Sequence, residues 1–240
     1  MRRSVVRFWS SDVGLSALLV ALILIVFVLR PLVDLGLAGG RVVELMIAVV
    51  MLLSTWSVWG GRARMVMIGL GIGIVEAMRW LHWFGAAPHF AAWAALGSAA
   101  IIGLFIVLVL TRVFQPGPVT WHRIQGAVAV YLMFGLAWAQ AYQFVEALEP
   151  GAFQFPRGDV AAAGWFSPLL YFSFITLTTV GYGDILPVHP AARSLAMFAA
   201  LTGQLYPAIL IAKLVSLQVT AEVTAVGGHG GAPSEWQGRD

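Results

Sequence analysis

The stretch that decides the fold is Thr176-Leu177-Thr178-Thr179-Val180-Gly181-Tyr182-Gly183-Asp184. Gly181 and Gly183 can adopt positive φ at no steric cost. Because these glycines alternate with Val180 and Tyr182, successive carbonyl groups can point the same way, which an ordinary strand forbids. The stretch therefore predicts a ladder of oxygen rings that can replace the water around a potassium ion, built from the Thr179, Val180, Gly181 and Tyr182 carbonyls and the Thr179 hydroxyl.

The composition is that of an integral membrane protein. Of the 240 residues, 60% are hydrophobic and 10% are charged, whereas a soluble domain is about 25% charged. The net charge of +3 comes from scattered residues without a basic run, so we expect no nucleic-acid partner. The absence of cysteine excludes disulfides, thiolate metal sites and cysteine nucleophiles. No catalytic constellation and no cofactor motif is present, which predicts a protein that is not an enzyme.

Six apolar stretches qualify, or nearly qualify, as membrane spans of about 20 residues. They cover roughly residues 13–30, 42–59, 65–84, 91–111, 124–147 and 191–215. The first is longer than the apolar core of a signal peptide, so we expect it to be retained as a helix. Residues 1–115 then form a four-helix module, 116–123 a linker and 124–219 a second module. Residues 220–240 have the composition of a disordered tail.

Lysine and arginine in the short connections predict the orientation. With the N-terminus inside, the inner flanks hold eight of these residues and the outer flanks five. This bias has the sign of the positive-inside rule. We therefore expect both termini in the cytoplasm and the Gly183-Asp184 end of the decisive stretch outside.

The segment between the last two spans predicts a re-entrant loop. Residues 148–164 are too polar to span and suit an exposed turret, and Ser167-Pro168 is a helix-start signal with Ser as the N-cap. The helix expected over residues 168–178 is too short to cross about 30 Å of hydrocarbon. Its negative C-terminal end would point at the centre of a pore. Non-helical backbone at this depth is tolerated only inside protein or along a water-filled path.

With these features in place, the run TxTTVGYGD resembles the selectivity filter of the potassium channels, written TVGYG. The resemblance covers residues 124–215 closely, and only the six-span layout extends it to the first half. It implies an all-α bacterial cell-membrane protein with six transmembrane helices, a re-entrant pore helix and a filter loop, assembled as a fourfold-symmetric homotetramer in the lipid bilayer. The implied function is passive conduction of K⁺, which is the permeant ion and no cofactor. The implied coordinating residues are Thr179, Val180, Gly181, Tyr182 and Gly183.

The resemblance also implies residues that support the filter. Thr178 ends the pore helix beneath it, and Asp184 anchors it from behind. Tyr171 and Phe172 occupy the positions of two tryptophans in well-studied relatives, in which we take the second to hydrogen-bond the aspartate. Because Phe172 cannot donate a hydrogen bond, the resemblance leaves the inactivation behaviour of this filter in doubt.

Two helix-weakening residues lie one turn apart in the last span. Gly203 follows Asp184 by nineteen residues, the spacing of the inner-helix hinge glycine in the family. Glycine weakens a helix by about 1 kcal/mol relative to alanine, and Pro207 removes a backbone hydrogen bond from the same turn. The sequence leaves two roles open for Gly203, a gating hinge and close packing against a neighbouring helix.

The fourth stretch decides against one form of gating. Voltage-gated relatives carry Arg or Lys at every third position there, whereas Ala91 to Leu110 holds no charged residue. We therefore expect no voltage gating by an arginine-rich helix. Two other functions remain open at this stage: a potassium uptake transporter subunit, and a non-conducting or modulatory membrane subunit.

Overall fold

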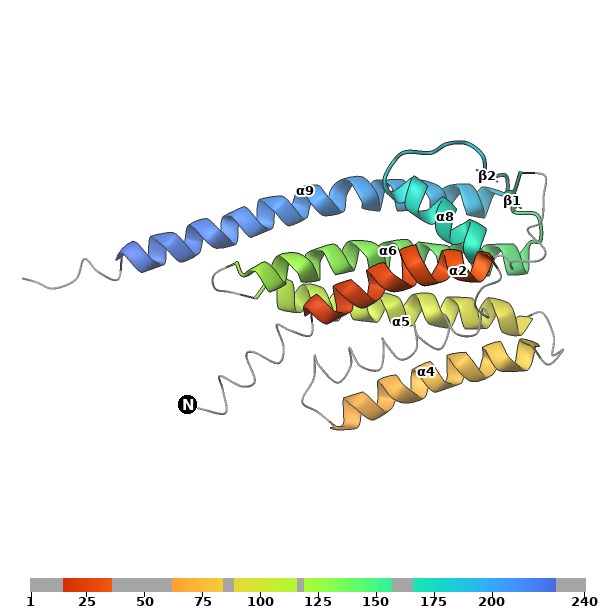
Figure 1. The fold of residues 1–240 in the computed structure, drawn as a ribbon, viewed down its shortest axis with the longest axis horizontal. Coiled ribbons are helices and arrows are strands. Elements are labelled where there is room, and N and C mark those ends of the chain that lie inside the picture. The colour runs from red at the N-terminus through yellow and green to blue at the C-terminus, as the bar shows by residue number, and fades with distance from the viewer. Residues whose placement is uncertain (1–14, 36–61, 84–88, 116–118, 157–165, 228–240) are drawn as a thin grey trace, which may run out of the picture.

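The computed structural model describes residues 15–35, 62–83, 89–115, 119–156 and 166–227 (Figure 1). The helix of residues 15–23 continues through a π-helical turn, η1 (Leu24–Leu29), into α2 (Arg30–Asp34); we call these segments together the N-terminal helix. The other helices are α4 (Arg62–Trp83), α5 (His89–Val113), α6 (Trp121–Leu148), α8 (Phe166–Leu177) and α9 (Pro190–Gly227). The second expected span, residues 42–59, lies outside the described residues.

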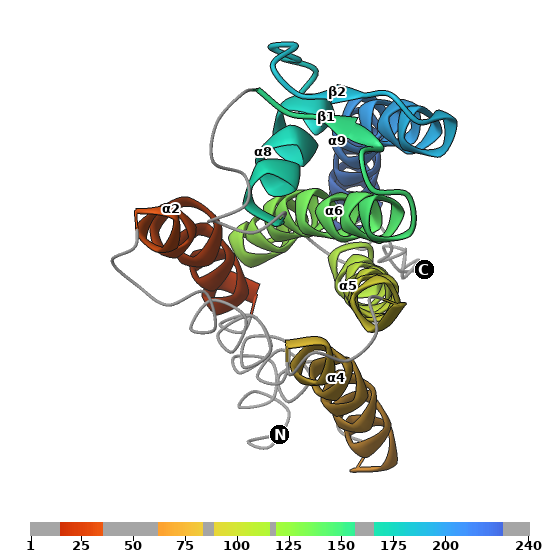
Figure 2. The same ribbon diagram turned by 90° about the vertical axis from the view of Figure 1, so that its right-hand side faces the viewer.

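Helix α6 is the centre of the arrangement. Seen end-on in Figure 2, α8 and α9 lie on one side of α6 and α5 lies on the other, with α4 beyond α5 and the N-terminal helix at the flank. The core that joins them is continuous, because buried residues of the N-terminal helix, α5, α6 and α8 form one hydrophobic cluster. The first half of the chain therefore packs directly on α6 and α8 of the same chain.

Small residues allow these helices to approach closely, as is common between helices in membranes. A Cβ at Gly126 of α6 would lie 3.2 Å from side-chain atoms of both Leu15 and Val113. Ala127, Ala129 and Ala139 on α6 are completely buried. The alanine and glycine content of α6 is thus explained by contacts on several sides.

Four helices in the described part of the chain are long and apolar enough to cross a membrane, within Leu15–Leu32, His89–Val113, Trp121–Leu148 and Pro190–Val219. In α4 the described apolar part is shorter, Gly69–Met78. These helices support a multi-pass, mostly helical membrane protein. Helix α9 corrects one boundary: it continues to Gly227, so residues 220–227 are helical although the sequence predicted a disordered tail from residue 220.

A small sheet interrupts the expected all-helical architecture. Strand β1 (Phe153–Gln154) pairs antiparallel with β2 (Leu186–Pro187), in the register Phe153 opposite Pro187. Ala152 and Phe153 are buried, so the base of the expected turret is packed and not exposed. The carboxylate of Glu146 holds this turn by accepting hydrogen bonds from the backbone N–H of Gly151 (2.9 Å) and Phe153 (3.1 Å).

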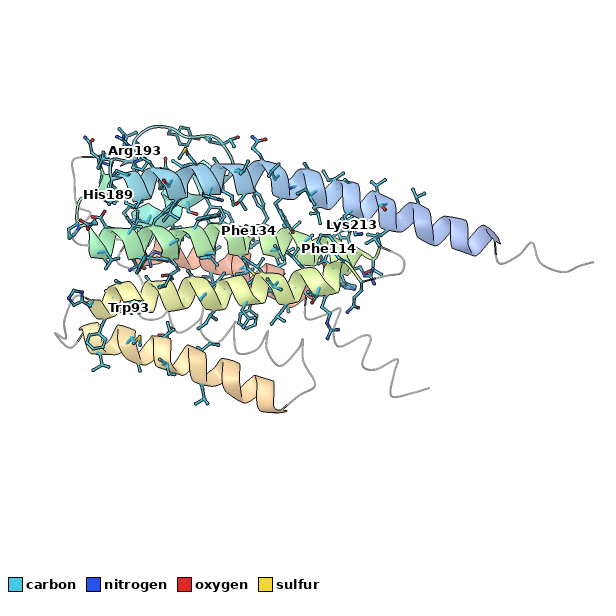
Figure 3. All side chains as sticks on the ribbon, turned by 180° about the vertical axis from the view of Figure 1, so that it is seen from behind. Trp93, Phe114, Phe134, His189, Arg193 and Lys213 are labelled. Atoms are coloured by element: carbon cyan, nitrogen blue, oxygen red, sulfur yellow. The ribbon has the colours of Figure 1, made fainter. Side chains whose placement is uncertain are left out.

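The β1–β2 pair also explains how α8 is placed. It ties the chain before α8 to the chain after the decisive stretch, at the end of the bundle where α6 terminates (Figure 1). Both ends of the intervening segment therefore lie at the same end of the bundle. His189 and Arg193 lie at this end, whereas Lys213 lies toward the other (Figure 3). With only 12 residues, α8 enters and the loop after it returns, which is the re-entrant path expected from its length.

Candidate functional site

The candidate site is the end of α8 and the segment that follows it. We call residues 178–184 the glycine loop. Helix α8 is fixed against α6 by a hydrogen bond from the buried Ser173 hydroxyl to the Gly135 carbonyl, 2.6 Å long. At the same crossing, a Cβ on Gly135 would lie 2.5 Å from the Phe174 ring. The glycine thus lets the Phe174 ring lie against the α6 backbone.

The start of α8 differs slightly from the sequence-based expectation. The helix begins at Phe166, so Ser167 lies in the first turn and is not the N-cap. Phe166 is packed under the Arg30 guanidinium, 5.1 Å from the ring centroid, and Phe174 contacts Phe27 at 6.0 Å between ring centroids. The N-terminal helix therefore braces α8 at two points, one in η1 and one in α2.

The π-helical turn explains how one helix reaches both rings. Pro31 has no N–H to donate to Phe27, four residues earlier, and the Arg30 N–H bonds the Ile25 carbonyl, five residues back. A π-turn inserts an extra residue into the helical repeat and so rotates the side chains beyond it. Phe27 and Arg30 thereby both meet α8.

The C-terminal end of α8 is closed by a Schellman motif. The Val180 N–H bonds the Ile175 carbonyl (2.9 Å), and the Thr179 N–H bonds the Thr176 carbonyl (3.0 Å). Thr179 takes the left-handed position of the motif with φ of +62°, where glycine is usual. For a β-branched residue this conformation is rare and costs about 1–2 kcal/mol. This conformation could not be predicted from residue type, since threonine disfavours positive φ.

Positive φ then recurs at every second residue. Thr179 has φ of +62°, Gly181 +52° and Gly183 +78°, and among the described non-glycine residues positive φ occurs only at Thr179. Val180 and Tyr182, between them, therefore keep negative φ. The positive φ expected for both glycines is confirmed. An alternation of left- and right-handed residues is the backbone pattern that lets consecutive carbonyls face one side.

The side chains of the glycine loop are exposed in the single chain. Val180 is 53% exposed and Tyr182 is 72% exposed, whereas Ile185, just beyond the loop, is buried. A Cβ at Gly181 or Gly183 would meet no atom within 4 Å. Crowding inside the chain therefore does not explain these glycines, and their backbone conformation does.

Asp184 is supported by the first of the two aromatic positions, Tyr171. The Tyr171 hydroxyl interacts electrostatically with the Asp184 carboxylate, and Asp184 accepts a hydrogen bond from the Ile185 N–H at 3.1 Å. Phe172 faces the other way and packs on Tyr142 (5.2 Å between ring centroids) and Phe153 (5.5 Å). The first of the two aromatic positions thus meets the aspartate, and the second belongs to the core beneath β1.

Gly203 lies against the end of α8. A Cβ at this position would overlap the Leu177 carbonyl oxygen and lie 2.6 Å from the carbonyl carbon. Helix α9 is continuous through Gly203 and Pro207. Of the two roles left open by the sequence, the structure therefore gives Gly203 a close-packing role, against α8 of its own chain.

Two half-buried tyrosines, which the sequence-based reasoning did not single out, join α6 to these elements. The Tyr131 hydroxyl donates to the Leu177 carbonyl (3.2 Å), and the Tyr206 hydroxyl donates to the Ala127 carbonyl (2.8 Å). A tyrosine inside an apolar span needs a partner for its hydroxyl. That requirement is the signal that would have found both residues.

The chemistry available here is electrostatic. The negative end of the α8 dipole lies where the glycine loop begins, and a cation is stabilised at such an end. Among the described residues there is no group of three or more His, Asp or Glu side chains that could hold a metal ion. The oxygens that the loop itself offers are those of its backbone carbonyls and threonine hydroxyls.

Comparisons with known proteins agree with this geometry. Residues 130–219, from the middle of α6 through most of α9, match the ion channel family. Over 127 residues the chain is 28% identical to the protein LctB of Bacillus caldotenax, which covers 52% of this chain and 93% of that protein. No solved structure matches. The family match supports an ion channel function, and together with the apolar helices it supports a multi-pass membrane protein.

Proposed function

We propose that this chain is one subunit of a homotetrameric, potassium-selective channel, in which residues 179–183 of each subunit supply one quarter of the filter. The observation that carries this proposal is the alternation of positive and negative φ from Thr179 to Gly183, directly after the C-terminal end of a re-entrant helix. Rings of backbone carbonyls that replace the hydration shell of K⁺ are the basis of such filters. Tyr182 completes the TVGYG pattern.

The exposed loop supports an assembly of several copies. A strained, non-helical backbone at membrane depth must be covered by protein or line a water path, and the glycine loop of one chain is covered on one side only, with Val180 and Tyr182 exposed. Exposed apolar residues continue the same uncovered surface along α9, at Met197, Phe198, Leu201 and Leu205. Four copies around one axis would cover both.

The remaining features of the proposed channel concern its layout in a bacterial cell membrane. Six spans, with residues 42–59 as the second, place both termini in the cytoplasm and the β1–β2 end outside. Gating by an arginine-rich helix is not part of the proposal, because Arg112 in the last turn is the only Lys or Arg of α5. Helix α5 also packs along α6 of its own chain and not in a separate sensor module.

The experiment is cation flux through purified full-length protein in liposomes, with outward K⁺ or outward Na⁺ gradients compared. We expect K⁺ flux that exceeds Na⁺ flux by about tenfold or more, which corresponds to about 1.4 kcal/mol. The variant Gly181→Asp is expected to lose selective flux and to keep the size of the tetramer in detergent. Equal K⁺ and Na⁺ flux through the wild-type protein would refute the filter assignment.

A further inference from the structure

The position of the glycine loop depends on the hydrogen bonds that the carbonyl groups at the end of α8 accept. The last four carbonyls of a helix have no partner within the helix. In α8, the Phe174, Ile175 and Thr176 carbonyls accept hydrogen bonds from backbone N–H groups of residues 178–181. The fourth, Leu177, accepts a hydrogen bond from the Tyr131 hydroxyl of α6 at 3.2 Å. The position of this last carbonyl is thus set by another helix.

Helix α9 also meets the Leu177 carbonyl. Gly203 approaches so closely that a Cβ there would overlap the carbonyl oxygen, and the Leu177 side chain is completely buried. The carbonyl is therefore held by a hydroxyl of α6 and by the backbone of α9. Neither contact involves a residue of the glycine loop.

Tyr131 is itself held in place. Its ring stacks on Tyr206 of α9 at 6.1 Å between centroids, and Phe134 meets the Tyr206 ring edge-on at 5.3 Å. The Phe134 side chain lies between α6 and α9 (Figure 3). The hydroxyl of Tyr131 therefore reaches Leu177 from a ring that packing has already oriented.

We propose that Tyr131 is a positioning residue of the ion pathway. Its hydroxyl fixes the end of α8 against Gly203, and this sets the height and orientation of the carbonyl rings that begin at Thr179. Four consecutive N–H groups bind residues 178–181 to the α8 carbonyls, so a displacement of the α8 end is passed directly to the loop. The inference rests on the proposed function, because it assigns Tyr131 a role in selectivity.

The test compares Tyr131→Phe with a matched control, Tyr206→Phe, in the full-length protein reconstituted into planar bilayers. Each substitution removes one part-buried hydroxyl from the same stack of rings, but only the first hydroxyl bonds the end of α8. The readout is the K⁺/Na⁺ permeability ratio from the reversal potential. A residue that only stabilises the fold changes the melting temperature and leaves this ratio alone.

Tyr131→Phe is expected to lower the permeability ratio by about two- to tenfold, the range that corresponds to one hydrogen bond. Tyr206→Phe is expected to keep the wild-type ratio. Gly203→Ala displaces the same carbonyl through its contact with α9 and is expected to lower the ratio as well. A wild-type ratio in both Tyr131→Phe and Gly203→Ala overturns the inference, as does an equal fall in Tyr206→Phe. A wild-type protein without selectivity would instead refute the proposed function.

Discussion

The substitution Gly203→Ala separates the two physical roles of the inner-helix glycine. If Gly203 served only as a weak point in α9, alanine would stabilise the helix by about 1 kcal/mol. In the structure the added methyl group would overlap the Leu177 carbonyl oxygen, and it would lie 2.6 Å from the carbonyl carbon. The two roles thus predict effects of opposite sign.

The size of the effect follows from which atoms collide. Ordinary contact with a Cβ begins at 3.4 Å, so the carbonyl carbon must move from 2.6 Å to at least that distance. Both sides of the contact are backbone, so no side-chain rotation relieves it, and α8 or α9 must shift. Overpacking of this kind costs about 1–3 kcal/mol. We therefore expect Gly203→Ala to destabilise the protein by about that amount in spite of its better helix propensity.

The assay is thermal unfolding of the purified protein in detergent, followed by circular dichroism. The control is Gly103→Ala in α5, where an added Cβ meets no atom within 4 Å, and we expect a neutral or slightly stabilising effect there. A melting temperature for Gly203→Ala equal to or above that of Gly103→Ala would refute the close contact between α9 and α8, and the hinge interpretation would stand.

Three further substitutions test other contacts of the site. Gly135→Ala is expected to destabilise by about 1–3 kcal/mol through the Phe174 ring, and the double variant with Phe174→Leu should recover most of the loss in the same melting assay; no recovery would argue against that contact. Glu146→Gln replaces one of the two acceptor oxygens by an N–H donor that faces a backbone N–H. The free energy of unfolding should therefore fall by about 1–3 kcal/mol; an unchanged melting curve would contradict the role of Glu146 in the turn. Tyr171→Phe removes the hydroxyl that interacts with Asp184 and should shorten the decay time of K⁺ current in planar bilayers by about two- to tenfold; an unaltered decay time would show that this interaction does not hold the loop.

Much of the site was predictable because the backbone conformation of its residues follows from their own residue types and those of their neighbours. Gly181 and Gly183 were expected at positive φ from residue type alone, and both adopt it. The short helix before them was expected from its length and apolar character, and it spans Phe166–Leu177. Such features depend on a few neighbouring residues, so a short stretch of sequence is enough to predict them.

What the sequence did not predict depends on contacts between distant segments. The role of Gly203 was left open because the atom that meets it, the Leu177 oxygen, belongs to another helix. The sequence left Asp184 without an assigned partner because Phe172 cannot donate a hydrogen bond; Tyr171 meets the aspartate, since the rotation of α8 decides which of two adjacent rings faces the loop. The β1–β2 pair joins segments more than thirty residues apart that are only two residues long, too short for a strand pattern. Thr179 adopts positive φ against its own preference because the surrounding hydrogen bonds require it.

The most direct test of the account is one reversal potential. Purified full-length protein in a planar bilayer, with KCl on one side and an equal concentration of NaCl on the other, reports the selectivity of the pore in a single current–voltage curve. We expect a current that reverses at least about 60 mV from zero, the direction being that of a K⁺-selective path, which corresponds to a tenfold preference for one monovalent ion. A current that reverses near zero would show a pore that does not distinguish K⁺ from Na⁺, and would contradict the proposal that the glycine loop is a potassium filter.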